Sequence, residues 1–282
     1  MRWRGRRTSG NIDDRRGMGR VAGGAGIGGA GLVAVLLIGY FFGIDVTPLL
    51  DQGGGGRQAE APAGPNTIDD ATEEFVAVVL GDTEQVWQAI FEASGLSYAP
   101  PVLVLYSGVT RSACGGADAA MGPFYCPNDK RIFLDTDFFA VLQDRLGAEG
   151  EFARAYVIAH EVAHHVQAEL GLLGRIHSIR SRVGRAEANA LSVRTELQAD
   201  CYAGLWARHA EDRFGILEPG DIASAMEAAA RIGDDALQRA AGGVVVPDSF
   251  THGSSAQRQH WFGEGFRTGD PAACDTFAAE EI

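Results

Sequence analysis

The chain has 282 residues, of which 46% are apolar, 9% aromatic and 22% charged, a balance typical of a globular protein. The formal net charge is −13, although the first 20 residues carry seven Arg against two Asp. The acidic charge therefore lies in the rest of the chain, which excludes a nucleic-acid-binding body, because such a body needs clustered positive charge. Four Cys without a C-x-x-C pair exclude a zinc ribbon or a thioredoxin-type site. Any metal must be bound by His and carboxylates.

The N-terminal region predicts a membrane anchor. Residues 1–20 are a basic cytoplasmic tail in this interpretation, and residues 21–44 contain no charged side chain. A helix of this length spans a hydrocarbon core of roughly 30 Å, so we expect a transmembrane helix. A cleavable signal peptide is the alternative, but A-x-A-like sites occur only near residues 59–63, far beyond the apolar run. The leading Arg residues predict a single-pass protein of the cytoplasmic (inner) membrane, with the N-terminus cytoplasmic and the main domain extracytoplasmic.

The next segment, residues 45–66, is predicted to be a linker. It contains four consecutive Gly and two Pro between Gly53 and Pro65, a composition that cannot bury a core. The extracytoplasmic domain is therefore expected to cover residues 67–282.

The pattern of this domain predicts an α+β fold that is mainly helical, with a small β-sheet. Thr67 to Asp70 can cap a helix that ends near Ala93. Short apolar runs predict strands at Val102–Tyr106 and Arg131–Leu134. Further helices are expected at residues 137–146, 151–170, 185–214, 219–232 and 255–268.

The pentapeptide from His160 to His164, of sequence HEVAH, carries the sharpest chemical signal. Residues four apart lie on one face of a helix, so His160 and His164 can bind one Zn²⁺. Glu161 lies beside them and can take a proton from the metal-bound water. The alternative is a helix with two core histidines and a glutamate held by hydrogen bonds.

A catalytic zinc usually has three protein ligands and one open position, so a third ligand is required. Gln167 and Leu170 stand where a ligand class with a third His would have Gly and His, which excludes that class. Downstream, Glu196 and Asp200 share one face of a predicted helix. We assign Glu196 as the third ligand and Asp200 as the acceptor that orients a metal-bound His. A solvated acidic helix face is the alternative, but the residues that follow Glu196 are mostly apolar.

The chain resembles the bacterial neutral zinc metallopeptidases. The resemblance rests on Arg2–Arg7, Met121–Pro127, His160–Gln167, Glu196–Cys201, Val246–Ser255 and Trp261–Phe262. It implies a zincin fold with a Glu third ligand, in a domain outside the cytoplasmic membrane. The implied function is zinc-dependent hydrolysis of peptide bonds in a peptide or protein substrate. The alternative function is a non-catalytic zinc-binding module of the cell envelope, for which a general base such as Glu161 would have no use.

The four cysteines are even in number, which outside the cytoplasm favours two disulfides. Cys114 and Cys126 bracket a Gly-rich loop, while Cys201 and Cys274 can tie the second ligand helix to the C-terminal tail. The spacing does not fix this pairing, and free buried thiols are the alternative.

Hydrolysis also needs a hydrogen-bond donor for the oxyanion that forms at the attacked carbonyl. We consider His252, in a turn-like segment, for this role; the alternative is a structural histidine that helps to cap the last helix. Tyr125, Tyr156 and His260 are weaker candidates. A substrate is expected to add as a strand to a sheet edge supplied by the segment Met121–Leu134.

Overall fold

The computed structural model describes residues 1–16, 68, 70–118, 122–144, 147–148, 150–280 and 282. The predicted transmembrane helix at residues 21–44 and the predicted linker at residues 45–66 lie outside these ranges. Within them, no helix is long and apolar enough to cross a membrane.

The fold is α+β and mainly helical, as predicted, and its main sheet has the strand order β1–β2–β6–β5. Strands β1 (Ile12–Asp14), β2 (Val102–Tyr106) and β6 (Arg131–Asp135) are parallel, and β5 (Phe124–Cys126) is antiparallel to β6. Residues 103–106 of β2 are all buried, as expected for a central strand covered on both faces. A separate hairpin consists of β3 (Val109–Ser112) and β4 (Gly115–Asp118).

Eight α-helices accompany these strands in the described part of the chain. Their bounds are α3 (Ala71–Ala93), α4 (Phe138–Asp144), α5 (Glu151–Glu169), α6 (Leu172–Arg180), α7 (Arg185–Phe214), α8 (Asp221–Arg231), α9 (Asp234–Ala240) and α10 (Ser255–Thr268). The predicted Asp70 cap is present, since its carboxylate accepts the main-chain N–H groups of Thr72 and Glu73. The short helices α6 and α9 were not predicted.

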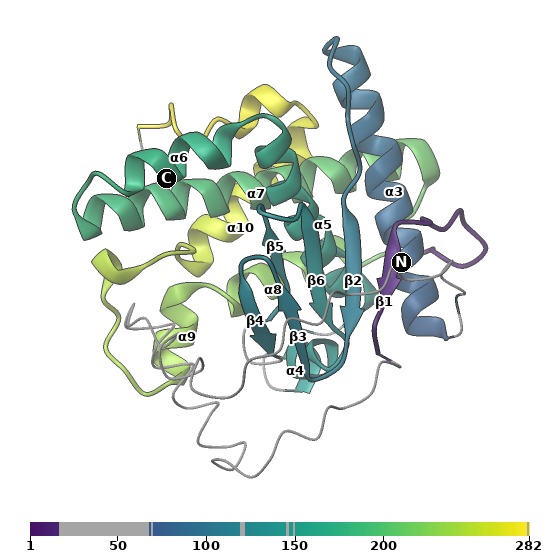
Figure 1. The fold of residues 1–282 in the computed structure, drawn as a ribbon, viewed down its shortest axis with the longest axis horizontal. Coiled ribbons are helices and arrows are strands. Elements are labelled where there is room, and N and C mark those ends of the chain that lie inside the picture. Colours follow the sequence, from purple (N-terminus) through teal and green to yellow (C-terminus); the bar gives the residue numbers. More distant parts are fainter. Residues whose placement is uncertain (17–67, 69, 119–121, 145–146, 149, 281) are drawn as a thin grey trace.

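Helix α5 occupies the centre of the domain, where α3, α7 and α8 pack around it and β5 and β6 lie against it (Figure 1). Helices α7 and α10 cross in close contact because glycines lie at the crossing. A Cβ atom at Gly204 would lie 2.0 Å from the Phe262 carbonyl oxygen, and one at Gly265 would lie 1.9 Å from that of Cys201. No larger residue fits at either position without moving the helices apart.

Residues 1–16 form part of this domain, which corrects the prediction of a separate basic tail. Trp3 is only 3% exposed and packs edge-on against Phe75 of α3. Ile12 pairs with Leu103 as β1 joins the sheet. The high Arg content of residues 1–16 suggested a solvated tail, so these apolar contacts were not predicted. The arginines pair with acidic residues of the domain; Nη2 of Arg6, for example, lies 2.6 Å from Oδ1 of the buried Asp82.

The pairing of β1 with β2 also bears on the predicted membrane topology. Hydrogen-bonded strands of one sheet lie in one compartment, so residues 12–14 and the helical domain share the same side of any membrane. A cytoplasmic N-terminus joined to an extracytoplasmic domain is not compatible with this pairing.

The predicted sheet edge is confirmed for one part of its segment and wrong for the other. Arg131–Asp135 (β6) lies inside the sheet, hydrogen-bonded to β2 on one side and β5 on the other. The sheet ends at β5, so the segment Met121–Leu134 supplies the edge through residues 124–126. The apolar run of β6 is longer than that of β5 because β6 is buried between β2 and β5.

We predict that Trp3→Ala lowers the free energy of unfolding by about 3–5 kcal/mol, the usual cost of truncating a buried aromatic side chain. Urea unfolding of the full chain measures this change. Arg7→Ala is the control, since Arg7 is exposed and its replacement should cost less than about 0.5 kcal/mol. Equal stability of both variants would show that residues 1–16 do not belong to the folded core.

Candidate metal centre

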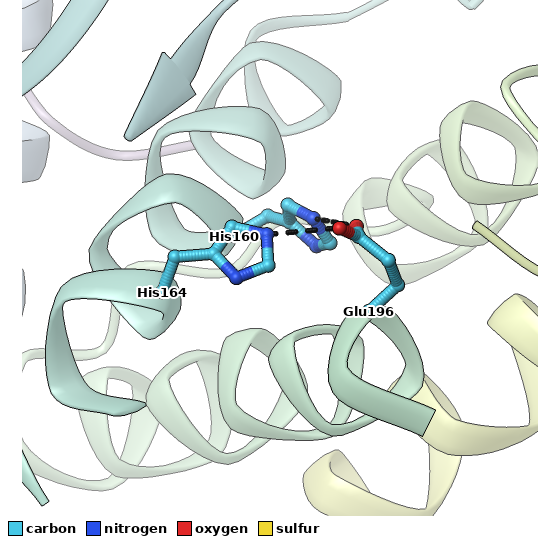
Figure 2. A group of neighbouring side chains, drawn as sticks. All are labelled: His160, His164 and Glu196. Atoms are coloured by element: carbon cyan, nitrogen blue, oxygen red, sulfur yellow. Dashed lines mark hydrogen bonds and ion pairs between the residues drawn. The ribbon is translucent and has the colours of Figure 1, made fainter. Parts of the chain in front are cut away.

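The two histidines of the HEVAH sequence lie on one face of α5 and point toward Glu196 of α7 (Figure 2). The Nε2 atom of His160 lies 3.1 Å from Glu196 Oε2, and that of His164 lies 3.5 Å from the same oxygen. One potential ligand atom from each of the three residues lies within 4.8 Å of the others. The structure therefore brings together the three ligands that the sequence predicted.

The donor set fits a zinc ion. Two imidazole nitrogens and one carboxylate oxygen are the ligands of one class of catalytic zinc sites, which keep a fourth position open. Both Nδ1 atoms are engaged elsewhere, at 2.8 Å from Asp200 Oδ1 for His160 and 2.9 Å from Gln167 Oε1 for His164. Each histidine thus keeps Nε2 for a metal.

Asp200 orients His160, as predicted. A carboxylate only accepts hydrogen bonds, so Nδ1 of His160 donates to Asp200 Oδ1, and Nε2 is the ring nitrogen that faces Glu196. Asp200 lies one turn after Glu196 on α7 and is completely buried. The order of the two acids is therefore the one assigned from sequence, with Glu196 at the cluster and Asp200 behind it.

Two further residues bind Asp200, and neither was predicted to do so from the sequence. Arg258 of α10 donates from Nε to Oδ2 at 2.8 Å and from Nη2 to Oδ1 at 3.0 Å. Tyr156 of α5 donates its hydroxyl to Oδ1 at 2.5 Å and is fully buried, so it does not face the cluster as an oxyanion donor. Arg258 precedes Trp261 and Phe262 by three and four residues, a spacing that places it on the buried face of α10, and this was the sequence signal for a buried charge.

The charges of the centre are tightly balanced. Burial lowers the pKa of His160, but the Asp200 and Glu196 carboxylates outweigh this effect and raise it to about 10. Burial raises the pKa of Asp200, but Arg258 and His160 outweigh it and lower the pKa from 3.8 to about 2. The ionised Asp200 therefore stabilises the fold above its unfolded-state pKa, and this stabilisation is lost as the pH falls toward about 2.

Glu161, the residue after the first histidine, is a buried acid with a raised pKa. Its side chain is 8% exposed, and burial raises its pKa above the ordinary value of 4.5 despite the opposing charges of His164 and His160. A raised pKa lies closer to neutral pH, and a carboxyl group with such a pKa can both accept and return a proton.

His252 lies in a loop that Asp234 shapes. Oδ2 of Asp234 accepts main-chain N–H groups from Thr251, His252 and Gly253 at 2.7, 2.7 and 3.0 Å. Burial raises the pKa of Glu196, but interactions with His164 and then with His252 outweigh it and lower the pKa well below its ordinary value. Its role as oxyanion donor stays a prediction.

The other candidate donors have different surroundings. Tyr125 makes a hydrogen bond of 3.2 Å with His165, whose second ring nitrogen lies 2.6 Å from the Ala99 carbonyl oxygen. His260 is exposed and stacks edge-on against Trp261. None of these contacts involves the metal cluster.

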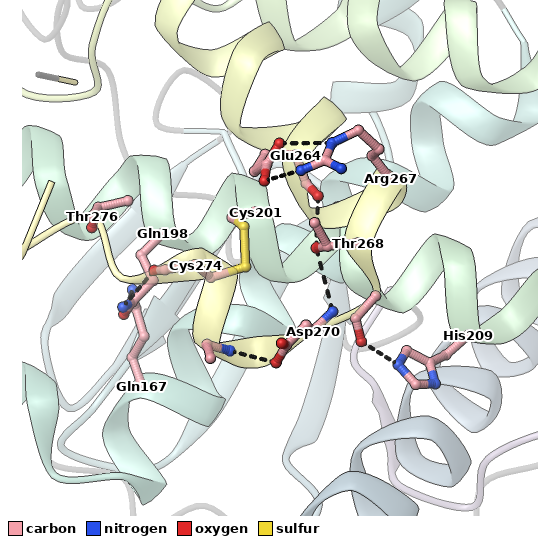
Figure 3. The surroundings of a disulfide bond; sticks show 12 residues. Gln167, Gln198, Cys201, His209, Glu264, Arg267, Thr268, Asp270, Cys274 and Thr276 are labelled. Carbon is pink, nitrogen blue, oxygen red and sulfur yellow. Dashed lines mark hydrogen bonds and ion pairs between the residues drawn. A yellow bond between two sulfur atoms is a disulfide. The ribbon is translucent and has the colours of Figure 1, made fainter.

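Both predicted disulfides are present. Cys114 is bonded to Cys126, which ties the β3–β4 hairpin to the end of β5. Cys201 of α7 is bonded to Cys274 in the tail that follows α10 (Figure 3). The described residues contain no free cysteine.

Comparison with known proteins agrees with this centre. A family described as "Putative neutral zinc metallopeptidase" matches residues 1–277. The chain belongs to this family. It is 46% identical over 289 residues to "Uncharacterized protein YpfJ" of Escherichia coli (strain K12), covering 98% of this chain and 99% of the relative. It is 45% identical over 217 residues to "Uncharacterized protein Rv2575" of Mycobacterium tuberculosis, covering 73% and 71%. No solved structure matches the chain, so the zincin fold implied by the resemblance stays a prediction.

We predict that the protein binds about one Zn²⁺ per chain through His160, His164 and Glu196. Metal analysis after dialysis should find little zinc in His164→Ala or Glu196→Gln. Asp200→Asn should retain the site with zinc affinity lowered by about ten- to a hundredfold, because it loses the acceptor that orients His160. Full zinc content in His164→Ala would contradict the ligand assignment, and loss of all zinc in Asp200→Asn would reverse the roles of the two acids.

Replacing Arg258 should destabilise the whole fold. Arg258→Met leaves the buried Asp200 carboxylate without its guanidinium, which typically costs about 3–5 kcal/mol. Arg267→Met on the same helix breaks an exposed ion pair with Glu264 and should cost less than about 1 kcal/mol. Denaturant unfolding of the two variants decides the question: similar costs would mean that the Arg258–Asp200 pair does not stabilise the fold.

Proposed function

We propose that this protein is a zinc-dependent metallopeptidase that hydrolyses peptide bonds. The observation that carries the proposal is the convergence of His160, His164 and Glu196, with the buried acid Glu161 one residue from the first ligand. A structural zinc site has four protein ligands and needs no general base. This arrangement favours hydrolysis over the non-catalytic binding module that the sequence left as the alternative.

Each residue has a distinct part in the proposed reaction. A zinc ion held by the three ligands would act as a Lewis acid on the attacking water and the substrate carbonyl. Glu161 takes a proton from the attacking water and returns it to the leaving amine. His252, placed by Asp234, donates a hydrogen bond to the developing oxyanion. Asp200 keeps the His160 ring in position throughout.

The substrate is proposed to be a peptide or a flexible protein segment bound as an added strand on β5. This strand ends the main sheet and lies against α5, the helix that carries both histidines. Main-chain hydrogen bonds to a sheet edge hold a peptide irrespective of its side chains. The net charge of −13 disfavours acidic substrates and nucleic acid, because both are repelled during approach.

The test is Glu161→Gln in the full chain. This change keeps the shape of the side chain and removes the base, so zinc content should equal that of the wild type while cleavage of a broad peptide library falls by at least about a hundredfold. Equal cleavage by both proteins would refute the role of Glu161. A zinc-loaded wild type that cleaves no peptide in the library would favour the binding module.

The uncharged stretch at residues 21–44 supports a further proposal, that the protein is attached to the cytoplasmic membrane. Two disulfides favour an extracytoplasmic domain, and the β1–β2 pairing adds residues 1–16 to it. Gly10→Cys and Leu96→Cys introduce thiols at two exposed positions. In spheroplasts, a membrane-impermeant thiol reagent should label both variants. Labelling of Leu96→Cys alone would support the single-pass topology and contradict the pairing.

A further inference from the structure

The second histidine of the cluster is connected to the C-terminal tail by two buried glutamine side chains. Nδ1 of His164 lies 2.9 Å from Gln167 Oε1. Gln167 Nε2 donates to the Thr195 carbonyl oxygen at 2.8 Å and to Gln198 Oε1 at 3.0 Å. Gln198 Nε2 donates to the Cys274 carbonyl oxygen at 3.1 Å. Gln167 and Gln198 are 0% and 7% exposed, and Figure 3 shows them beside the Cys201–Cys274 disulfide.

The chemistry of the two main-chain carbonyls sets the direction of every hydrogen bond in this chain of contacts. A carbonyl oxygen only accepts, so the NH₂ group of Gln198 faces Cys274 and its oxygen faces Gln167. The NH₂ group of Gln167 then faces Thr195 and Gln198, and its oxygen faces His164. An amide oxygen also only accepts, so Nδ1 of His164 must carry the proton.

We propose that this amide relay fixes the tautomer of His164, so that Nε2 always presents its lone pair to the metal. Gln167 is then a positioning residue, and Gln198 and the Cys274 carbonyl hold it in orientation. The inference rests on the proposed function in one respect only, that zinc binds at His160, His164 and Glu196.

The C-terminal tail, residues 274–279, is attached to α7 by a disulfide and by hydrogen bonds, so the Cys274 carbonyl has a defined position. Cys274 is bonded to Cys201, one turn of α7 beyond Gln198. Thr276 Oγ1 donates to the Arg194 carbonyl oxygen at 2.7 Å, and Arg194 Nη1 donates to the Ala279 carbonyl oxygen at 3.0 Å. The C-terminal segment is therefore part of the metal centre, although it offers no ligand.

The residue type at position 167 follows from the charge balance. The orienting group of His160 is a carboxylate, and Arg258 neutralises it. The hydrogen-bond partners of Gln167, namely His164, Thr195 and Gln198, include no cation of that kind. A neutral amide accepts from His164 without burying a second unpaired negative charge, which would be costly.

The first test uses the wild-type full-length protein loaded with Zn²⁺ and labelled with ¹⁵N-histidine. Long-range ¹H–¹⁵N correlation spectra distinguish a metal-bound ring nitrogen from a protonated one. We expect Nε2 of His164 to bind the metal and Nδ1 to carry the proton. A metal-bound Nδ1 would overturn the relay while leaving zinc binding intact, whereas a wild type that binds no Zn²⁺ would instead refute the proposed function.

The second test compares Zn²⁺ affinities by competition with a chelator. Gln167→Leu removes the acceptor and should weaken binding by about ten- to a hundredfold. Gln167→Glu keeps an oxygen facing Nδ1 but buries a carboxyl group and loses the donors to Thr195 and Gln198, so it should bind Zn²⁺ less tightly than the wild type and more tightly than Gln167→Leu. A space-filling role predicts the opposite order, because leucine would fill the site and a buried carboxylate would disturb it. That order would overturn the proposal.

Two further variants complete the comparison. Gln198→Leu breaks the connection to Cys274 but leaves the Thr195 contact, so its affinity should lie between those of the wild type and Gln167→Leu. An affinity equal to that of the wild type would remove the tail from the relay. Gln85→Leu is the matched control: Gln85 binds the Gly81 carbonyl oxygen on α3, away from the centre, and its replacement should leave Zn²⁺ affinity unchanged.

Discussion

The buried carboxylate of Asp200 is the interaction on which the centre and much of the helical packing depend. It accepts hydrogen bonds from Tyr156 and His160 of α5 and from Arg258 of α10, while its own main chain belongs to α7. An unpaired carboxylate at a fully buried position would cost several kcal/mol, so these donors must all be in place when the protein folds. The contact that joins three helices is also the one that turns Nε2 of His160 toward Glu196.

This constraint gives α10 a part in the centre through Arg258, although α10 contributes none of the three cluster residues. Arg258 reaches Asp200 only because α7 and α10 approach closely at Gly204 and Gly265, where a Cβ atom would overlap a main-chain carbonyl. Within a few turns, α7 carries Glu196 of the cluster, Gln198, the carboxylate of Asp200 and the disulfide-bonded Cys201. One helix thus connects the metal ligands with both the last helix and the tail.

The N-terminal residues show how composition can conceal structure. Seven Arg in 20 residues suggest a solvated tail, yet Trp3 and Ile12 are buried and β1 extends the sheet. The domain provides acidic partners for these cations, as in the pairs of Arg6 with Asp82 and of Arg16 with Asp70. A run of charged residues is solvated only when the protein offers no surface of opposite charge. Here the acidic surface lies on α3 and at its N-terminus, more than 50 residues later in the chain.

The sequence by itself determined the features that depend on neighbouring residues. The spacing of His160 and His164, the helices that carry them and Glu196, the strand Val102–Tyr106 and the Asp70 cap all follow from local periodicity and local hydrogen bonds. Tertiary structure alone decided that β1 joins the sheet, that β5 rather than β6 forms its edge, and that Arg258 and Gln167 support the two histidines. Arg258 is 58 residues from Asp200 along the chain. No periodic pattern relates such distant positions, because their contact depends on how the helices pack.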